Sequence, residues 1–196
     1  MDVRWIEPLR WLMVGTPLLA AVAVVGVPWD RAEPEWLPAG GDFTVNTAEG
    51  PLALHDWRGS VGLVYFGFGS CADVCPTSLA SIGRALESLE PGEVEHVRGL
   101  FVSLDPERDS LALLHDLTAL VHPALRGGTA PVAELRPITD RYGVAWRKTE
   151  VDSALGYVID HSSTVSVIAP DGQLVEQLRH GTPPDAIAAA IRRHLP

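Results

Sequence analysis

The chain has 196 residues, a formal net charge of −10 and a hydrophobic content of 46%. A chain of this length accommodates one ordinary domain with a proper core and a short additional segment. The excess of acidic residues argues against nucleic acid as a partner, because phosphate contacts require clustered lysine and arginine. Two cysteines are too few for a disulfide-rich scaffold.

The N-terminal segment predicts a single transmembrane anchor. Residues 11–28 are uncharged and mostly apolar, and about 17 such residues lie at the lower limit for a membrane span. Arg4 and Arg10 precede this stretch, which favours a cytoplasmic position for residues 1–10 and export of the remainder. A cleaved signal peptide ending near Ala23 is the alternative, but apolar residues continue past that point. We therefore expect an inner (cytoplasmic) membrane protein with its folded domain on the outer, periplasmic side.

A tether and a β-hairpin are expected after the anchor. Residues 29–41 are rich in proline and glycine and contain few candidates for a core, so they predict a stiff linker. The folded domain is expected to span residues 42–196. Short strands at 43–45 and 52–54 flank a turn and predict an N-terminal hairpin. An apolar run at 61–66 predicts a buried strand.

The rest of the chain mixes helices with further strands. Helices are expected at 77–89, 110–121 and 132–142, and after Thr182, which can cap the last helix with Asp185 three positions on. Strands are expected at 97–104, 144–148, 158–159, 164–168 and 174–178, and residues 123–131 are expected to form a loop. This order predicts an α/β layered domain. A dithiol between a strand and a helix in such a pattern indicates a thioredoxin-like fold.

The two cysteines are the strongest candidates for chemistry. Cys71 and Cys75 lie between the predicted buried strand and the helix that follows it, and Pro76 suits the first turn of that helix. A helix N-terminus stabilises thiolate over thiol, so both sulfurs are expected to be reactive and to be good metal ligands. Such a dithiol can bind a metal or oxidise, and a purely structural disulfide is a further alternative.

Among the seven histidines, His161 is the candidate for a third ligand. It directly precedes a β-branched run, which places it at the mouth of a strand, whereas His115 and His122 are expected to be solvated. The alternative is a structural or exposed histidine that is hydrogen-bonded to a neighbouring backbone group and binds no metal. The charged segment from Asp105 to Asp109 closes the second buried strand. It predicts a turn with a helix cap at Asp109 or Ser110, or a charged loop at the same sheet edge as the cysteines.

Three motifs of the sequence resemble those of a known family. The resemblance is carried by Tyr65-Phe66-Gly67 leading into Cys71-x-x-x-Cys75-Pro76-Thr77, by Ser103-Leu104-Asp105-Pro106-Glu107-Arg108-Asp109, and by Asp160-His161-Ser162. These motifs are similar to those of the Sco/SenC family of membrane-anchored copper proteins, which is linked to cytochrome c oxidase assembly. The resemblance implies a thioredoxin-like fold and one copper ion bound by Cys71, Cys75 and His161. Phe68-Gly69-Ser70 departs from the family pattern, which usually has a threonine and a bulkier residue before the first cysteine.

Two functions follow from this resemblance. The first is a copper metallochaperone that delivers copper to the copper-bearing subunit of cytochrome c oxidase, with exported copper chaperones or thiol reductases as further partners. Thiolates select Cu(I), and one imidazole also allows Cu(II). The second is a thiol–disulfide oxidoreductase that reduces the target's copper-ligand cysteines, with Cys71 attacking and Cys75 resolving. A redox or copper sensor and a peroxidase are lesser alternatives.

Overall fold

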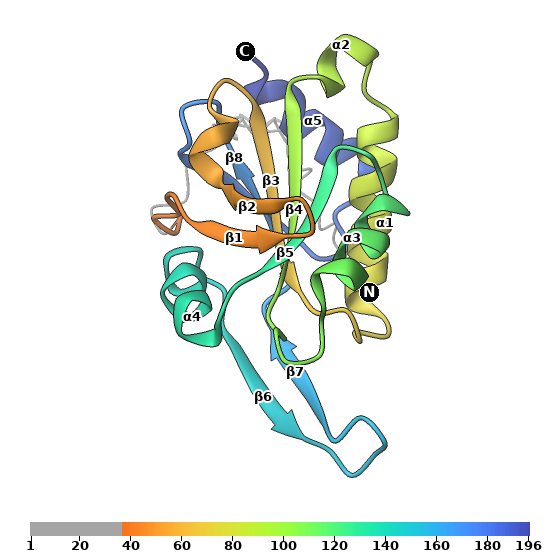
Figure 1. Cartoon of the computed structure of the whole chain (residues 1–196). Coiled ribbons are helices and arrows are strands. Elements are labelled where there is room, and N and C mark those ends of the chain that lie inside the picture. Colours follow the sequence, from red (N-terminus) through yellow and green to blue (C-terminus); the bar gives the residue numbers. More distant parts are fainter. Residues whose placement is uncertain (1–36) are drawn as a thin grey trace, which may run out of the picture. The chain divides into compact units, whose positions relative to one another are not determined.

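The computed structural model describes residues 37–196, drawn in colour in Figure 1. The predicted anchor at residues 11–28 and most of the predicted tether lie outside the described residues. Of the helices in the described part of the chain, none has the length and apolarity that crossing a bilayer requires. The folded unit includes residues ahead of 42, because the Gly40 N–H donates to the Arg141 carbonyl at 2.8 Å and the Tyr142 hydroxyl donates to the Gly41 carbonyl at 2.8 Å.

A seven-stranded sheet runs through the described part, in the order β2–β1–β5–β4–β3–β8–β9. The strands are β1 (Thr44–Thr47), β2 (Gly50–Ala53), β3 (Val61–Gly67), β4 (Val97–Ser103), β5 (Leu125–Thr129), β8 (Thr164–Ile168) and β9 (Leu174–Arg179). Neighbours β3, β4 and β5 are parallel, and the other pairs in the sheet are antiparallel. The predicted N-terminal hairpin is confirmed as β1 and β2.

A separate antiparallel hairpin extends beyond the sheet at the bottom of Figure 1. It consists of β6 (Trp146–Glu150) and β7 (Tyr157–His161), paired from Trp146 opposite His161 to Glu150 opposite Tyr157. The sequence predicts this hairpin, but β7 is longer than the strand predicted at residues 158–159. It ends at the histidine that the sequence singles out.

The helices cover both faces of the sheet. They are α1 (Val74–Glu87), α2 (Pro91–Val94), α3 (Leu111–Ala119), α4 (Val132–Arg141) and α5 (Pro184–His194), with a short 3-10 helix η1 at Leu54–Trp57. Helices α1 and α3 each connect two parallel strands along the same direction of the sheet, so right-handed crossovers place both on one face. Figure 1 shows them together, and α5 packs against α1. The arrangement matches the α/β expectation.

The centre of the sheet is buried because its strands are apolar on both sides. All seven residues of β3 are buried, and alternate residues point to opposite faces. On the face of α1, Tyr65 stacks on Phe101 with ring centroids 6.0 Å apart. On the opposite face, Phe66 packs against Tyr142, which follows α4, at 5.6 Å. Aromatic pairs of this kind stabilise a core beyond their burial, so β3 is held firmly from both sides.

The parallel strands end in one row. Gly67 at the end of β3 lies opposite Ser103 at the end of β4, and Ser103 lies opposite Thr129 at the end of β5. The loops that follow these strands therefore begin side by side at the same sheet edge, where ligand sites of parallel sheets commonly form.

The expected loop at residues 123–131 is wrong, because β5 occupies Leu125–Thr129. Its sequence contains Gly127 and Gly128 and gives no apolar pattern. The packing explains the glycines: a Cβ atom on Gly127 would lie 2.3 Å from the Leu114 carbonyl oxygen of α3. The helix thus lies directly on the strand, and the residues that allow this contact remove the hydrophobic signal of a strand.

Helix starts differ from expectation at two places. α1 begins at Val74 rather than at residue 77, so Cys75 lies inside its first turn. Thr182 does not cap α5, because its hydroxyl donates to the Arg179 carbonyl at 2.7 Å and no side chain caps this helix. The predicted cap at Ser110 is confirmed, since its hydroxyl accepts the Leu113 N–H at 3.2 Å. Pro183 at the N-cap position has no side-chain acceptor, and Pro184 as the first residue of α5 already sets the backbone of the first turn.

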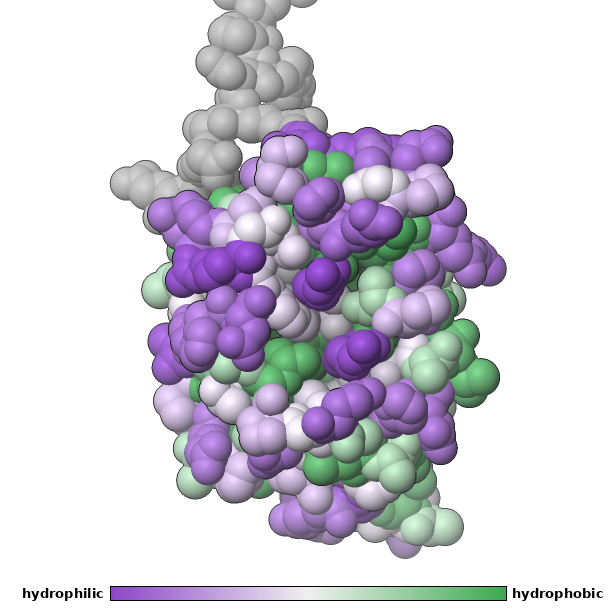
Figure 2. Space-filling model, turned by 45° about the horizontal axis from the view of Figure 1, so that its top comes forward, coloured by the Kyte–Doolittle hydropathy of each residue, from purple (hydrophilic) through white to green (hydrophobic). Residues whose placement is uncertain are grey.

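The surface of the domain is mainly polar. Figure 2 shows one face on which hydrophilic residues predominate and hydrophobic residues form separate smaller areas.

Candidate metal centre

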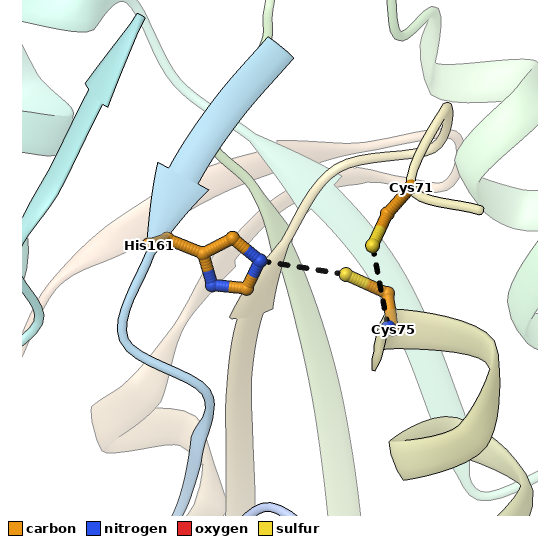
Figure 3. Close-up of side chains that lie close together, drawn as sticks. All are labelled: Cys71, Cys75 and His161. Carbon is orange, nitrogen blue, oxygen red and sulfur yellow. Dashed lines mark hydrogen bonds between the residues drawn. The ribbon is translucent and has the colours of Figure 1, made fainter. Parts of the chain in front are cut away.

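Cys71, Cys75 and His161 converge at one point (Figure 3). The two sulfur atoms and a ring nitrogen lie within 4.8 Å of one another, and Cys75 Sγ is 3.5 Å from His161 Nε2. Cys71 comes from the loop after β3, Cys75 from the first turn of α1, and His161 from the end of β7. Within the described residues no other group of three or more histidine, cysteine or acidic side chains is close enough to hold a metal ion.

The central strand and α1 hold Cys75 in place. Its side chain is 2% exposed and lies over the end of β3, where a Cβ atom on Gly67 would be 2.9 Å from Cys75 Sγ and 2.7 Å from the Phe101 ring. Gly67 therefore makes room for the sulfur. Because the backbone of α1 and the packed strand below both constrain it, Cys75 has little freedom to move.

Cys71 lies in a loop that we call the Cys71 loop, residues 68–73 between β3 and α1. The Cys71 N–H donates to the Phe68 carbonyl at 3.2 Å, which closes a turn. Its sulfur accepts the Cys75 N–H at 3.3 Å, so Cys71 takes up a main-chain donor at the start of α1 that would otherwise have no partner. Both cysteines are free thiols, with Cys71 partly exposed. Cys71 is thus the more accessible of the two.

The expectation of a ready thiolate at Cys75 is wrong for the metal-free protein. Burial raises the pKa of the Cys75 thiol to about 12, and the neighbouring Cys71 adds to the increase. Desolvation disfavours the charged form more than the start of the helix favours it. Cys75 therefore keeps its proton at neutral pH, and this proton has to leave when a metal ion binds.

His161 is prepared to act as a neutral ligand. Its Nδ1 lies 2.9 Å from the Ser162 carbonyl oxygen, and a carbonyl only accepts, so Nδ1 carries the proton. Nε2 then presents its lone pair toward Cys75. Burial lowers the pKa of His161, which keeps the ring uncharged. A histidine with one nitrogen held by a backbone carbonyl and the other free is the usual arrangement of a metal ligand.

The hairpin that carries His161 is fixed at its base. Trp146, opposite His161, donates its indole N–H to the Thr139 hydroxyl at 3.0 Å and lies under the Arg136 guanidinium at 3.7 Å. The Ser162 N–H donates to the Ala145 carbonyl at 2.9 Å. An open hollow of about 410 Å³ lies beside the ligand and is lined by Ala145, Trp146, Arg147, Asp160, His161 and Ser162. A partner molecule can therefore approach the imidazole from this side.

The segment from Asp105 to Asp109 lies at the same sheet edge, as the second interpretation of its sequence predicts. The Tyr157 hydroxyl of the hairpin donates to Asp105 at 2.8 Å, and the Arg108 guanidinium lies 3.7 Å from the centre of the Tyr157 ring. Asp109 accepts the Gly69 N–H of the Cys71 loop at 2.7 Å. The segment thus contacts both the Cys71 loop and the hairpin that carries His161.

Tyr65 also lies at this site, although the sequence did not single it out as a functional residue. Its hydroxyl is buried beside Cys75 and Ser78 but forms no hydrogen bond of good geometry within residues 37–196, and burial raises its pKa. An orphaned hydroxyl at this position suits a site in which the thiol becomes a metal-bound thiolate that accepts a hydrogen bond. The signal was present, because Tyr65 lies two residues before Gly67 and so on the same strand face.

No other histidine in the described part of the chain joins this group of three side chains. His115 is exposed, as expected, and pairs with Glu49 at 2.9 Å. His122 was also expected to be solvated but is half-buried, with its Nδ1 accepting the Ala124 N–H at 3.1 Å. His180 lies 2.9 Å from the Ser78 hydroxyl of α1.

Comparison with known proteins places these features in a family. Residues 32–196 match the sequence model described as SCO1/SenC. The chain is 31% identical over 158 residues to the mitochondrial Protein SCO2 homolog of Bos taurus. The aligned region covers 79% of this chain and 59% of that protein. The chain thus spans less than two thirds of this relative's length.

Solved structures agree with the sequence match. The fold is similar to Bradyrhizobium japonicum ScoI with copper bound, with a TM-score of 0.72 and 29% identity, covering 80% of this chain and 99% of that one. It is also similar to apo Sco1 from Thermus thermophilus, with a TM-score of 0.72 and 32% identity, covering 80% and 91% respectively. The chain therefore shares the α/β fold of these thioredoxin-like Sco structures, as the sequence predicts. The chain belongs to the SCO1/SenC family.

Proposed function

We propose that this protein is a copper metallochaperone that carries one copper ion on Cys71, Cys75 and His161. The observation that supports this most directly is the convergence of two sulfurs and one imidazole nitrogen within 4.8 Å. The solved relative from Bradyrhizobium japonicum is described with copper bound, which favours the same cargo here.

The chemistry of the donors favours copper over other metals. Thiolates are soft ligands that select Cu(I), and a single imidazole lets the site also hold Cu(II). Structural zinc prefers four closed ligands, whereas this group offers three within the described part of the chain. A partner can then supply a further ligand and withdraw the ion by ligand exchange. The hollow beside His161 gives such a partner its approach.

The partner we propose is the copper-bearing subunit of cytochrome c oxidase, with other exported copper chaperones or thiol reductases acting before or after it. Family membership supports this choice.

We also propose that residues 11–28 anchor the protein in the inner (cytoplasmic) membrane with the domain on the periplasmic side. Fractionation of cells followed by protease treatment from the outer side tests this topology, and a soluble, cleaved product would contradict a retained anchor.

The carrier function is tested by anaerobic titration of the full-length, fully reduced protein with Cu(I), with accessible thiols counted before and after. We expect one copper ion per chain and protection of both thiols from alkylation. Binding that leaves either thiol as reactive as in the metal-free protein would contradict the proposed ligand set. The absence of binding under these conditions would contradict the carrier function itself.

A second candidate function is supported by the asymmetry of the two thiols. Cys71 is partly exposed and Cys75 is buried next to it, which suits an attacking and a resolving cysteine. In this role Cys71 attacks a disulfide of the target, Cys75 releases the product, and the protein is left with a Cys71–Cys75 disulfide. An external dithiol reductant then has to restore both thiols.

The substitution His161→Ala separates the two functions. Loss of a metal ligand is expected to weaken copper binding by more than the roughly 10–100-fold that follows loss of an outer-shell partner. Reduction of a model disulfide should persist, because the imidazole is not one of the exchanging sulfurs. Competition with a chelator measures the first quantity, and the release of a chromogenic thiol measures the second. An equal loss of both would make His161 a catalytic base instead of a ligand.

A further inference from the structure

The Cys71 loop is tied to the rest of the domain by a main-chain contact. The Gly69 N–H donates to Asp109 Oδ2 at 2.7 Å, across 40 residues of sequence. The hydrogen bond from the Cys71 N–H to the Phe68 carbonyl lies within the loop itself, and the one from the Cys75 N–H to Cys71 Sγ joins the loop to the start of α1. The contact with Asp109 adds a tie on the other side, to the segment that follows β4.

Asp109 is itself held rigidly. Its side chain is 3% exposed, and Oδ2 also accepts the hydroxyl of Ser103 at the end of β4. The Ser103 carbonyl in turn accepts the Thr129 hydroxyl at the end of β5 at 2.8 Å. A carboxylate that accepts a main-chain N–H forms one of the stronger kinds of hydrogen bond. The row of strand ends is thus connected through Asp109 to the Cys71 loop.

Gly69 has the shape that this contact requires. A Cβ atom on Gly69 would lie 2.8 Å from Asp109 Oδ1 and 2.8 Å from Cδ2 of Leu113 in α3. Such distances are too short for a side chain to fit without displacing the carboxylate. The glycine and the aspartate therefore form a matched pair.

We propose that Asp109 is a positioning residue for the metal site, because its carboxylate holds the Gly69 N–H and so keeps Cys71 Sγ facing Cys75 and His161. This inference rests on the proposed copper-carrier function, to which it adds the contact that aligns the sulfur of the loop. It also gives a role to the second aspartate of the Asp105 to Asp109 segment, while the first contacts the hairpin through Tyr157. One short segment thereby aligns two of the three candidate ligands.

The test compares Asp109→Ala and Asp109→Asn with Asp116→Asn. Asp116 is an exposed carboxylate of α3, so its variant makes the same change of charge without touching the loop. Three quantities are measured on the full-length protein: the alkylation rate of Cys71 in the metal-free state, resolved from Cys75 by peptide mass; the Cu(I) affinity; and the thiolate-to-Cu(II) charge-transfer absorption.

For Asp109→Ala we expect faster alkylation of Cys71, no increase at buried Cys75, a copper affinity lower by roughly 10–100-fold, and a shifted charge-transfer band. Asp109→Asn retains one acceptor oxygen and should fall between Asp109→Ala and wild type. Asp116→Asn should match wild type in all three measurements. A merely structural role would lower the melting temperature without a change in the absorption of the copper complex.

The inference is overturned if Asp109→Ala folds and matches wild type in Cys71 alkylation, copper affinity and spectrum. Should that variant fail to fold, Gly69→Ala tests the same contact, because its new methyl group pushes against the carboxylate. Wild-type behaviour of Gly69→Ala would then overturn the inference. If wild-type protein binds no copper, the proposed function fails, whereas faster Cys71 alkylation in Asp109→Ala still supports the positioning of the loop.

Discussion

Cys75 and Cys71 present the same kind of atom to the same point, but the molecule holds them in different ways. Cys75 is part of a helix and packs on the central strand, with its sulfur against Gly67 and Phe101. Cys71 depends on hydrogen bonds within and around a loop. His161 resembles Cys71 in this respect, because it ends a hairpin that is attached at its base. One ligand is therefore fixed by the core and two are brought to it by surface segments.

This difference suits the proposed carrier function, in which the ion has to be released. A ligand in a packed core keeps its place whether or not metal is present, whereas ligands on loops and hairpins open at a lower cost in free energy. In that proposed function, transfer to a partner proceeds from the side of the site where Cys71 and the hollow beside His161 lie. Cys75 would be the last ligand to release the ion.

The largest expected effect comes from removal of either sulfur. Cys71→Ser and Cys75→Ser should each weaken Cu(I) binding by more than the roughly 10–100-fold typical of outer-shell changes, because a hard hydroxyl replaces a soft thiolate. Competition titration against a Cu(I) chelator measures this. If one of the two variants bound copper as tightly as wild type, the contrast between a ligand in the core and a ligand on a loop would no longer hold.

The next effect concerns the space that the core reserves for Cys75. In Gly67→Ala the new methyl group would contact the Phe101 ring and Cys75 Sγ, and overpacking of this kind costs about 1–3 kcal/mol of unfolding free energy. Denaturant unfolding measures the change, and copper affinity should fall with it. Gly92→Ala is the matched control, because its Cβ atom meets nothing within 4 Å. Equal stability of the two variants would argue against a tightly packed Cys75.

The pH dependence of copper binding sharpens the same contrast. Because burial raises the pKa of Cys75 to about 12, its thiol is protonated at neutral pH and gives up that proton on binding. Copper affinity should therefore increase about tenfold per pH unit for this one proton, across the range from neutral pH toward pH 9. Calorimetry in buffers of different ionisation enthalpy counts the released protons. Affinity independent of pH would mean that Cys75 is already a thiolate.

The smallest effect is expected on the outer surface of the hairpin. Arg147 and Asp160 form an ion pair at 3.0 Å with both side chains largely exposed. Arg147→Ala should change the unfolding free energy by at most about 1 kcal/mol, since exposed ion pairs contribute little. Thermal melting and copper titration together check this. A large loss of copper affinity would show that the hairpin depends on this pair rather than on Trp146 at its base.

The sequence by itself determined the features that rest on local patterns. The apolar run of β3, the strands β8 and β9, a helix cap at Asp109 or Ser110 and the placement of Cys71 and Cys75 between a strand and a helix were all predicted. These depend on neighbouring residues, so a short window of sequence contains the necessary information. Local context also singled out His161 among the histidines, and the family resemblance then implied that it is the third ligand.

Tertiary structure decided whatever depends on contacts between distant segments. It made a strand of β5, whose glycines carry no apolar pattern but allow α3 to lie directly on it. It buried Cys75 deeply enough for desolvation to outweigh the helix N-terminus, and it brought Asp109 to Gly69 across 40 residues. Burial and close approach are properties of the packed chain, because they arise only when elements far apart in sequence share the same space.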